Sequence, residues 1–139
     1  MSVSKNNVHF KEVAIPWIGT LPMNWDSRKA KYLFNRKQRP IPPNSGIITA
    51  FRDGEVTLRS KRRTDGFTVA LKEIGYQGVK AGDLLIHSMD AFAGAIGVSD
   101  SDGRCSPVCN VCVGNNEVFS PYYGYLLRVM AKMGHILAL

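Results

Sequence analysis

A chain of 139 residues, 45% of them hydrophobic and 21% charged, fits one globular domain with a hydrophobic core and excludes collagen-like or wholly disordered proteins. No apolar run approaches the roughly 20 residues that span a bilayer, and the first residues lack the apolar segment of a signal peptide, so we expect a cytoplasmic protein with no membrane partner. Residues 1–80 carry 15 Lys and Arg against 6 Asp and Glu, a net of +9, which residues 81–139 reduce to the formal net charge of +7. This one-signed bias favours a polyanion such as nucleic acid over a merely solvated surface.

The first predicted elements in chain order are short. Residues 1–25 predict an irregular N-terminal arm, because Pro, Gly and Trp alternate in "IPWIGTLPMNW". Residues 26–34 predict either a short helix capped by Asp26 or a strand followed by a helical turn. Residues 46–51 and 55–59 predict the two strands of a hairpin, because the Asp-Gly pair between them is typical of tight turns.

The following segments predict further strands. A strand or turn of helix that begins at Phe67 leads to a loop at 76–82 and to a buried apolar strand at 84–88. The sequence "SDSDGR" (99–104) predicts a turn, and "SPVCNVCV" (106–113) predicts a strand that begins after its proline.

Residues 120–133 predict a C-terminal amphipathic helix. Ser120 is a suitable N-cap, Pro121 suits the first helical position and Gly134 suits the end of the helix. The apolar side chains expected on one face are Tyr123, Leu126, Leu127, Met130 and Met133. Together the elements predict a single α+β domain over residues 1–139, with a mixed or antiparallel β-sheet, few helices and this helix packed on the sheet.

Two sets of residues invite a chemical interpretation. His87 and Asp90 suggest a general base with an orienting carboxylate, but residues three apart on a strand face opposite sides, and no nucleophile accompanies them. The three cysteines suggest zinc, but their spacing is not that of paired Cys-x-x-Cys knuckles, and Cys109 and Cys112 would face opposite sides of their strand. We therefore expect buried, reduced thiols, no metal site and no cofactor.

Several short motifs occur here in the order and spacing found in one protein family. They are a Gly-x-x-Pro-x-x-Trp opening, a Gly-Asp at the head of an apolar strand, a Met-Asp with a glycine-rich continuation, and a turn followed by Ser-Pro. The matching residues are Gly19, Pro22, Trp25, Gly82, Asp83, Met89, Asp90, Gly94, Gly97, Gly103, Ser106 and Pro107. From about residue 15 to residue 130, the chain resembles the target recognition domain of the DNA specificity subunit of type I restriction-modification systems.

The resemblance implies a DNA-reading protein that is not an enzyme. Specificity subunits read double-stranded DNA for a methyltransferase (modification) subunit, which holds S-adenosylmethionine, and for a restriction subunit, a translocating endonuclease. This chain would then hold no cofactor itself. The "MDAFAGAIG" stretch would be a shape element, in which Gly94 and Gly97 permit bends and close backbone approach while Asp90 holds a turn or meets a base amino group.

DNA contacts are expected chiefly from the basic run "LRSKRR" (58–63). Its cations can straddle phosphates and place a guanidinium on a guanine edge, and an arginine beside the hairpin turn is a further candidate. With the residues that end the 84–88 strand, the expected DNA-binding residues are Arg52, Arg59, Lys61, Arg62, Arg63, His87, Ser88 and Asp90.

The chain departs from the family pattern at two points. A complete specificity subunit has two target recognition domains separated by long helical spacers, and this sequence shows neither the spacers nor a second recognition domain. We expect a fragment, a truncated reading frame, or a half-subunit that forms a homodimer to read both halves of a bipartite site. Cys109 also stands where an aromatic residue is expected, which removes bulk from that strand.

Two other functions remain open. A free-standing nucleic-acid-binding module of another kind would use the same basic runs, with Tyr32 and Phe34 as stacking platforms for single strands. A small hydrolase would use His87, Asp90 or a cysteine, and substitution of His87 or Cys109 would then abolish its turnover.

Overall fold

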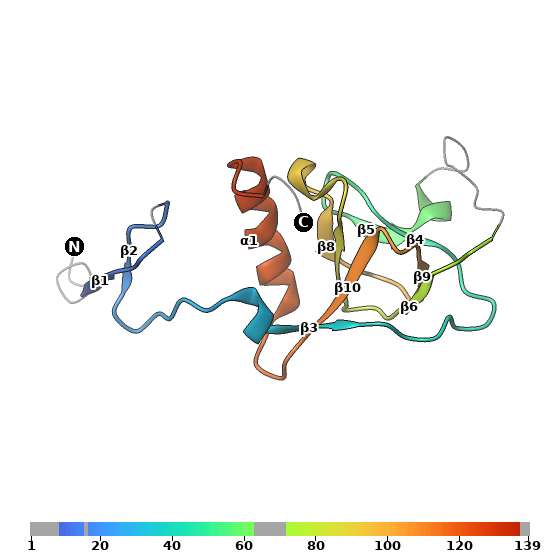
Figure 1. Cartoon of the computed structure of the whole chain (residues 1–139), viewed down its shortest axis with the longest axis horizontal. Helices are drawn as coiled ribbons and strands as arrows, with labels where there is room; N and C mark the ends of the chain where they lie inside the picture. The colour runs from blue at the N-terminus through green and yellow to red at the C-terminus, as the bar shows by residue number, and fades with distance from the viewer. Residues whose placement is uncertain (1–8, 16, 63–71, 137–139) are drawn as a thin grey trace, which may run out of the picture. The chain divides into compact units, whose positions relative to one another are not determined.

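The computed structural model of the chain describes residues 9–15, 17–62 and 72–136. Contacts divide the chain into two compact units, residues 1–32 and 33–139. The described residues form short strands, single turns of 3-10 helix and one α-helix (Figure 1). The chain is therefore an α+β protein with mostly antiparallel strands, as the sequence predicts. No helix in the described ranges is long and apolar enough to cross a membrane.

The first unit contains a short antiparallel hairpin within the arm that the sequence predicts to be irregular. Strand β1 (Phe10–Glu12) pairs with β2 (Thr20–Pro22), and the Val13 N–H donates to the Gly19 carbonyl oxygen, 3.0 Å away. None of the described residues up to Tyr32 is buried. The core of the protein therefore comes from the second unit.

A 3-10 turn, η2 (Ala30–Tyr32), comes before strand β3 (Phe34–Lys37). Neither alternative predicted for residues 26–34 is correct, since the helical turn precedes the strand. Strand β3 pairs antiparallel with β10 (Cys109–Gly114), far along the chain. This long-range pairing decides that the segment is extended, which local propensity does not.

The second unit is built from antiparallel strand pairs. Its main sheet has the strand order β3-β10-β7-β8. Two separate two-stranded sheets, β4 with β5 and β6 with β9, make up the rest of the unit. The hairpin predicted around Asp53-Gly54 is confirmed as the β4–β5 pair, and the strand predicted at 84–88 is confirmed as β7. The remaining strands are β4 (Ile48–Ala50), β5 (Val56–Leu58), β6 (Gln77–Val79), β7 (Leu84–His87), β8 (Ile96–Val98) and β9 (Gly103–Cys105).

Strands β6 and β9 overlap the segments predicted as a loop (76–82) and a turn (99–104), so those predictions are correct only for residues 76, 80–82 and 100–102. Strand β6 is fully buried, and a Cβ atom on Gly78 would lie 2.5 Å from the Pro40 carbonyl oxygen. This glycine therefore permits close backbone packing inside a strand, where the sequence suggested a loop. The strand or helical turn expected from Phe67 lies largely outside the described residues.

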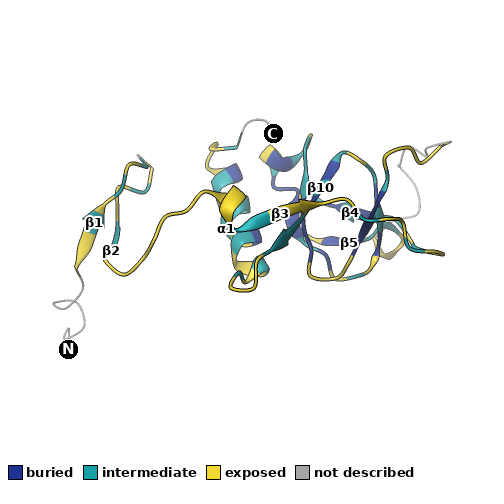
Figure 2. Ribbon diagram, turned by 60° about the horizontal axis from the view of Figure 1, so that its bottom comes forward, coloured by how far each residue is buried: buried dark blue, intermediate teal, exposed yellow. Residues whose placement is uncertain are grey.

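Two hydrophobic clusters fill the second unit. Leu85 and Val111 belong to the cluster that includes the β4–β5 hairpin, whereas Leu84 and Ile96 belong to the cluster beneath helix α1 (Ser120–Lys132). The assignment of adjacent residues to different clusters follows from the period of two in a strand. Figure 2 shows that the buried residues gather in this unit.

Helix α1 is confirmed close to its predicted bounds, with two corrections. The N-cap is Phe119, which has extended backbone angles, and not Ser120, which is already helical. Met133 was expected on the packed face, but 56% of it is exposed, because the helix ends at Lys132 and Gly134 turns the chain with a φ of 83°. The helix packs on strand β8 and buries Gly124 and Ala131.

Candidate functional site

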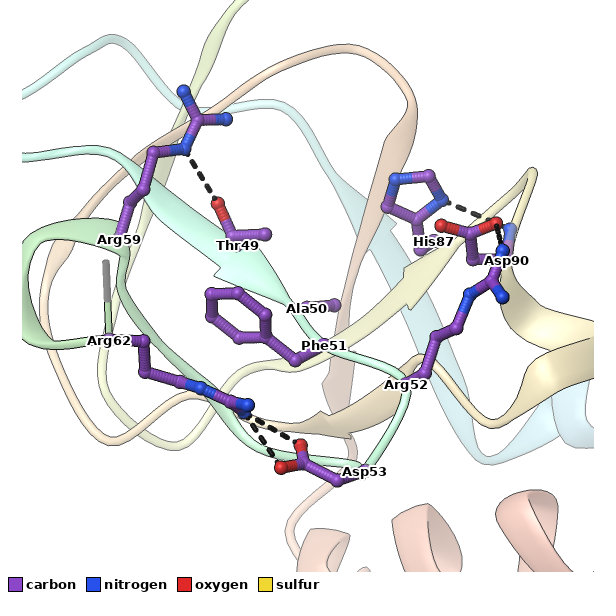
Figure 3. Close-up of a pocket in the computed structure, with 9 residues that line it drawn as sticks. All are labelled: Thr49, Ala50, Phe51, Arg52, Asp53, Arg59, Arg62, His87 and Asp90. Carbon is purple, nitrogen blue, oxygen red and sulfur yellow. Dashed lines mark hydrogen bonds and ion pairs between the residues drawn. The ribbon is translucent and has the colours of Figure 1, made fainter. Parts of the chain in front are cut away.

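A surface pocket of about 610 Å³ lies where the β4–β5 hairpin meets the end of β7. Figure 3 shows the side chains that line it. They are Thr49, Ala50, Phe51, Arg52, Asp53, Arg59, Arg62, His87 and Asp90. The hairpin contributes most of these residues, and β7 with its following turn contributes the rest. Two segments that are distant in the sequence therefore form one site.

Five of the eight expected DNA-binding residues line this pocket: Arg52, Arg59, Arg62, His87 and Asp90. Lys61 and Ser88 do not line it. The Lys61 ammonium group lies 3.1 Å from the Ser101 hydroxyl and 3.7 Å from an Asp100 carboxylate oxygen, and the Ser88 hydroxyl donates to the Val108 carbonyl oxygen. Arg63 lies outside the described residues.

Arg62 is held in place from two sides. Its guanidinium carbon lies 4.1 Å from the centre of the Phe51 ring, which is the geometry of a cation–π contact. Its Nη1 atom lies 2.9 and 2.8 Å from the two carboxylate oxygens of Asp53. The backbone N–H of Glu55 and the Arg62 guanidinium donate to Asp53 and lower the pKa of that carboxyl group.

Arg59 approaches the pocket from the end of the hairpin. It begins the 3-10 turn η3 (Arg59–Lys61), directly after strand β5. Its Nε–H donates to the Thr49 hydroxyl oxygen on the neighbouring strand β4, 3.3 Å away. This contact between neighbouring strands orients the Arg59 guanidinium. Figure 3 shows Arg59 on the opposite side of the pocket from His87.

Arg52, Asp90 and His87 form a small polar cluster on the other side of the pocket. The Arg52 Nη2 atom donates to Asp90 Oδ1 at 3.0 Å, and the backbone N–H of Asp90 donates to His87 Nδ1 at 3.1 Å. A neutral imidazole that accepts at Nδ1 carries its proton on Nε2. The expectation that His87 and Asp90 face opposite sides of a strand is wrong, because β7 ends at His87 and the chain turns there.

Two glycines bring the hairpin turn onto the segment after Asp90. A Cβ atom on Gly94 would lie 2.8 Å from the Arg52 carbonyl oxygen, and one on Gly97 would lie 2.1 Å from the Gly54 carbonyl oxygen. Gly94 also has a φ of 99°, in the left-handed region that favours glycine. The expectation that Gly94 and Gly97 permit a bend and close backbone approach is confirmed.

The sequence interpretation missed the contribution of Thr49, Phe51 and Asp53 to the pocket. The sequence indicates Asp53 only as a turn residue, whereas in the structure its carboxylate also accepts from Arg62. An arginine near an aromatic residue carries no clear sequence signal, because the two meet through the hairpin fold and not at a regular spacing. In the strand predicted over residues 46–51, Thr49 and Phe51 are two residues apart and so fall on one face, which is the signal that the sequence offers.

The cysteines lie away from this pocket. Cys105 and Cys109 are buried in the first hydrophobic cluster, and Cys112 packs against the second, so Cys109 and Cys112 do face opposite sides of their strand as expected. The neighbouring Cys109 thiol and burial raise the pKa of Cys105, and burial raises the pKa of Cys112. Within the described ranges, no group of three His, Cys, Asp or Glu side chains is placed to hold a metal.

The pocket offers hydrogen-bond donors and acceptors with a small excess of positive charge. Three arginines and two aspartates line it, so the charge balance is one positive charge when His87 is neutral. Its two ion pairs are exposed, with 64% of the Arg52 side chain and 59% of the Asp53 side chain accessible, and exposed pairs are weak enough to be exchanged for a ligand. No family model matches the sequence, and the comparison with curated proteins finds no match.

Proposed function

We propose that the chain is a recognition module for double-stranded DNA that reads one half of a bipartite site, like the target recognition domains of type I restriction-modification systems. Its partners would be a methyltransferase subunit and a translocating endonuclease subunit. The observation that carries the proposal is the convergence of Arg52, Arg59 and Arg62 with His87 and Asp90 in one exposed pocket. Guanidinium groups suit both phosphates and guanine edges, which is the combination that DNA reading needs.

Two of the three arginines are oriented by contacts inside the pocket. The Arg62 guanidinium lies against the Phe51 ring and donates to Asp53, and the Nε–H of Arg59 donates to the Thr49 hydroxyl oxygen at 3.3 Å. A guanidinium suits either a phosphate or a guanine edge. On this proposal Arg62 contacts the DNA backbone and Arg59 contacts a base edge, and substitution of each residue by alanine distinguishes the two roles.

Two observations weigh against the other functions. Phe34, one of the two stacking platforms expected of a single-strand binder, packs edge-on against Tyr123 with ring centres 5.8 Å apart and contacts the second hydrophobic cluster, which leaves Tyr32 as the exposed one. A hydrolase would need a nucleophile beside His87, but the Ser88 hydroxyl bonds the Val108 carbonyl and Cys109 is buried. We therefore propose a binding role without catalysis.

The experiment is a domain exchange. The chain replaces one recognition domain of a full-length type I specificity subunit, and methylation of genomic DNA is mapped by sequencing. We expect the hybrid to methylate a bipartite sequence in which one half differs from that of the parent subunit. We expect Arg59→Ala to relax the base preference at one position of that half, with a loss of roughly 1 to 3 kcal/mol in discrimination between bases. Lys80→Ala, which removes an exposed cation outside the pocket, is the control. A hybrid that assembles but methylates with no half-site preference would contradict the proposal.

A further inference from the structure

The Arg52–Asp90 pair places a donor group and an acceptor group side by side at the pocket. Their closest atoms, Arg52 Nη2 and Asp90 Oδ1, are 3.0 Å apart, and 64% of the Arg52 side chain and 34% of the Asp90 side chain are exposed. We infer that these two residues together read one G·C base pair in the major groove, with Arg52 on guanine and Asp90 on cytosine. The inference rests on the proposed function and names the base pair that this part of the site recognises.

The edge of a G·C pair matches the chemistry of the two side chains. In the major groove guanine presents two acceptors, N7 and O6, and cytosine presents the N4 amino donor directly beside O6. An arginine has five N–H donors, so Arg52 can bond both guanine acceptors while it keeps its bond to Asp90. An ionised carboxylate only accepts, so Asp90 suits the cytosine amino group.

An A·T pair fits the same two side chains less well. Its major-groove edge presents an acceptor, a donor and an acceptor in that order, so no two adjacent acceptors are available for the fork of Arg52. Asp90 does not gain a different partner by moving to the DNA backbone, because phosphates repel its carboxylate. The pair therefore selects G·C over A·T by at least one hydrogen bond.

The backbone around the pair is held firmly, as a base-reading site requires. A Cβ atom on Gly94 would lie only 2.8 Å from the Arg52 carbonyl oxygen. The hairpin turn and the turn after β7 are therefore in direct contact. The Asp90 N–H donates to His87 Nδ1, and the Asp90 carbonyl oxygen accepts from the N–H groups of Ala93 and Ala95 at 3.0 and 3.1 Å. The backbone that carries both side chains is thus fixed before DNA binds.

A purely structural role for the pair is the competing explanation. The contact joins two exposed side chains, and such pairs stabilise a fold only weakly. The two roles differ in what a mutation changes, because loss of a structural bridge would weaken binding to every sequence alike. Loss of a base-reading pair would change preference at one position of the site only.

The experiment is a binding selection with the full chain and a random duplex DNA pool, followed by sequencing. Wild type is compared with Arg52→Lys, Asp90→Asn and the charge swap Arg52→Asp with Asp90→Arg. We expect wild type to enrich a motif with one strongly preferred G·C pair. Arg52→Lys should reduce that preference roughly tenfold by loss of the bidentate fork, and Asp90→Asn should shift it toward A·T because an amide suits adenine.

The control and the charge swap separate the possible outcomes. Arg104→Lys alters an ion pair of the same kind, with Glu73, outside the pocket, and should leave the motif unchanged. The charge swap retains an ion pair, so a structural role predicts an unchanged motif, whereas base reading predicts a changed preference at one position. The inference is overturned if all variants enrich the wild-type motif, or if wild type prefers A·T there. A wild-type selection that enriches no motif would instead overturn the proposed function.

Discussion

Asp83, which belongs to the Gly-Asp motif before strand β7, has a structural role. Its carboxylate accepts from the Arg39 guanidinium and from the Lys80 backbone N–H, and only 6% of its side chain is exposed. The carboxylate of Asp83 raises the pKa of Arg39 through their hydrogen bond. The Gly-Asp pair at the head of β7 therefore ties the strand to the segment that follows β3.

Replacing Asp83 should destabilise the protein. Asp83→Ala leaves the Arg39 guanidinium, 24% of which is exposed, without its partner, and we expect a loss of about 2 kcal/mol in the free energy of unfolding. Urea denaturation followed by circular dichroism measures the change. The matched control is Asp26→Ala, whose carboxylate is 72% exposed and whose loss should cost less than about 0.5 kcal/mol. Equal effects of the two substitutions would contradict the structural role of Asp83.

Asp53 should make stability depend on pH in the acidic range. Its pKa is lowered in the folded chain by the Glu55 N–H and by Arg62, so its ionised form stabilises the fold above the unfolded pKa of about 4. That contribution is lost as the pH falls through the lowered pKa. Asp53→Asn retains a good hairpin turn and should be slightly less stable than wild type at pH 6, with the difference shrinking below about pH 4. Urea midpoints at both pH values test this, and a constant difference would refute it.

At the scale of elements, close backbone contact decides how the hairpin meets the main sheet. The β4–β5 turn lies against β8, and the Cα of Gly97 faces the carbonyl of Gly54. Helix α1 covers the same strand and also uses a glycine, Gly124, at its packed face. These glycines differ in what a side chain would meet, so they allow a matched comparison.

Gly97→Ala should disrupt the hairpin contact, whereas Gly124→Ala should be tolerated. A Cβ atom on Gly97 would lie 2.1 Å from a backbone oxygen, whereas one on Gly124 would lie 3.3 Å from the terminal Cδ1 atom of the Leu84 side chain, so only a small shift of that side chain is needed. We expect a loss of about 2 kcal/mol or more for Gly97→Ala. For Gly124→Ala we expect a change within about 1 kcal/mol, because alanine favours the helix. Thermal denaturation of both variants measures the difference, and similar stabilities would argue against the observed packing.

At the scale of the whole molecule, charge is distributed unevenly along the chain, and on the proposed function this distribution determines how the chain meets DNA. Residues 81–139 carry 3 Lys and Arg against 5 Asp and Glu, and several of these acids hold cations in the folded chain, as Asp90 holds Arg52 and Asp100 contacts Lys61. On the proposed function, binding to a duplex would exchange surface ion pairs such as Lys61–Asp100 for phosphate contacts, while Arg52 and Asp90 remain paired at a base. The net charge of +7 makes that exchange favourable at low salt.

The affinity of the full chain for random duplex DNA should fall steeply with salt. Each phosphate neutralised by a cation contributes about 0.9 to the slope of log K against log salt, so Lys61→Ala should reduce the slope by about that amount. Lys80→Ala, a second exposed lysine outside the pocket, should leave it unchanged. Fluorescence anisotropy over a range of salt concentrations measures the slopes. Equal slopes for all three proteins would remove Lys61 from the DNA-binding surface.

The sequence by itself determined the α+β class, the β4–β5 hairpin, β7, β10 and helix α1. Each of these has a local signal: an Asp-Gly turn, an apolar run, or a helical stripe that ends in Gly134. Local signals reflect neighbours along the chain, which is why β6 and β9, whose pairing joins Gln77 to Cys105, went unpredicted.

Only the tertiary structure decided the candidate site. The sequence named Arg52, Arg59 and Arg62 as candidates, and separately His87 and Asp90, but nothing in their spacing indicated that they line one pocket. That arrangement depends on backbone approaches at Gly94 and Gly97 and on a strand that ends at His87. Both are consequences of packing between distant segments, and local propensity carries no information about such contacts.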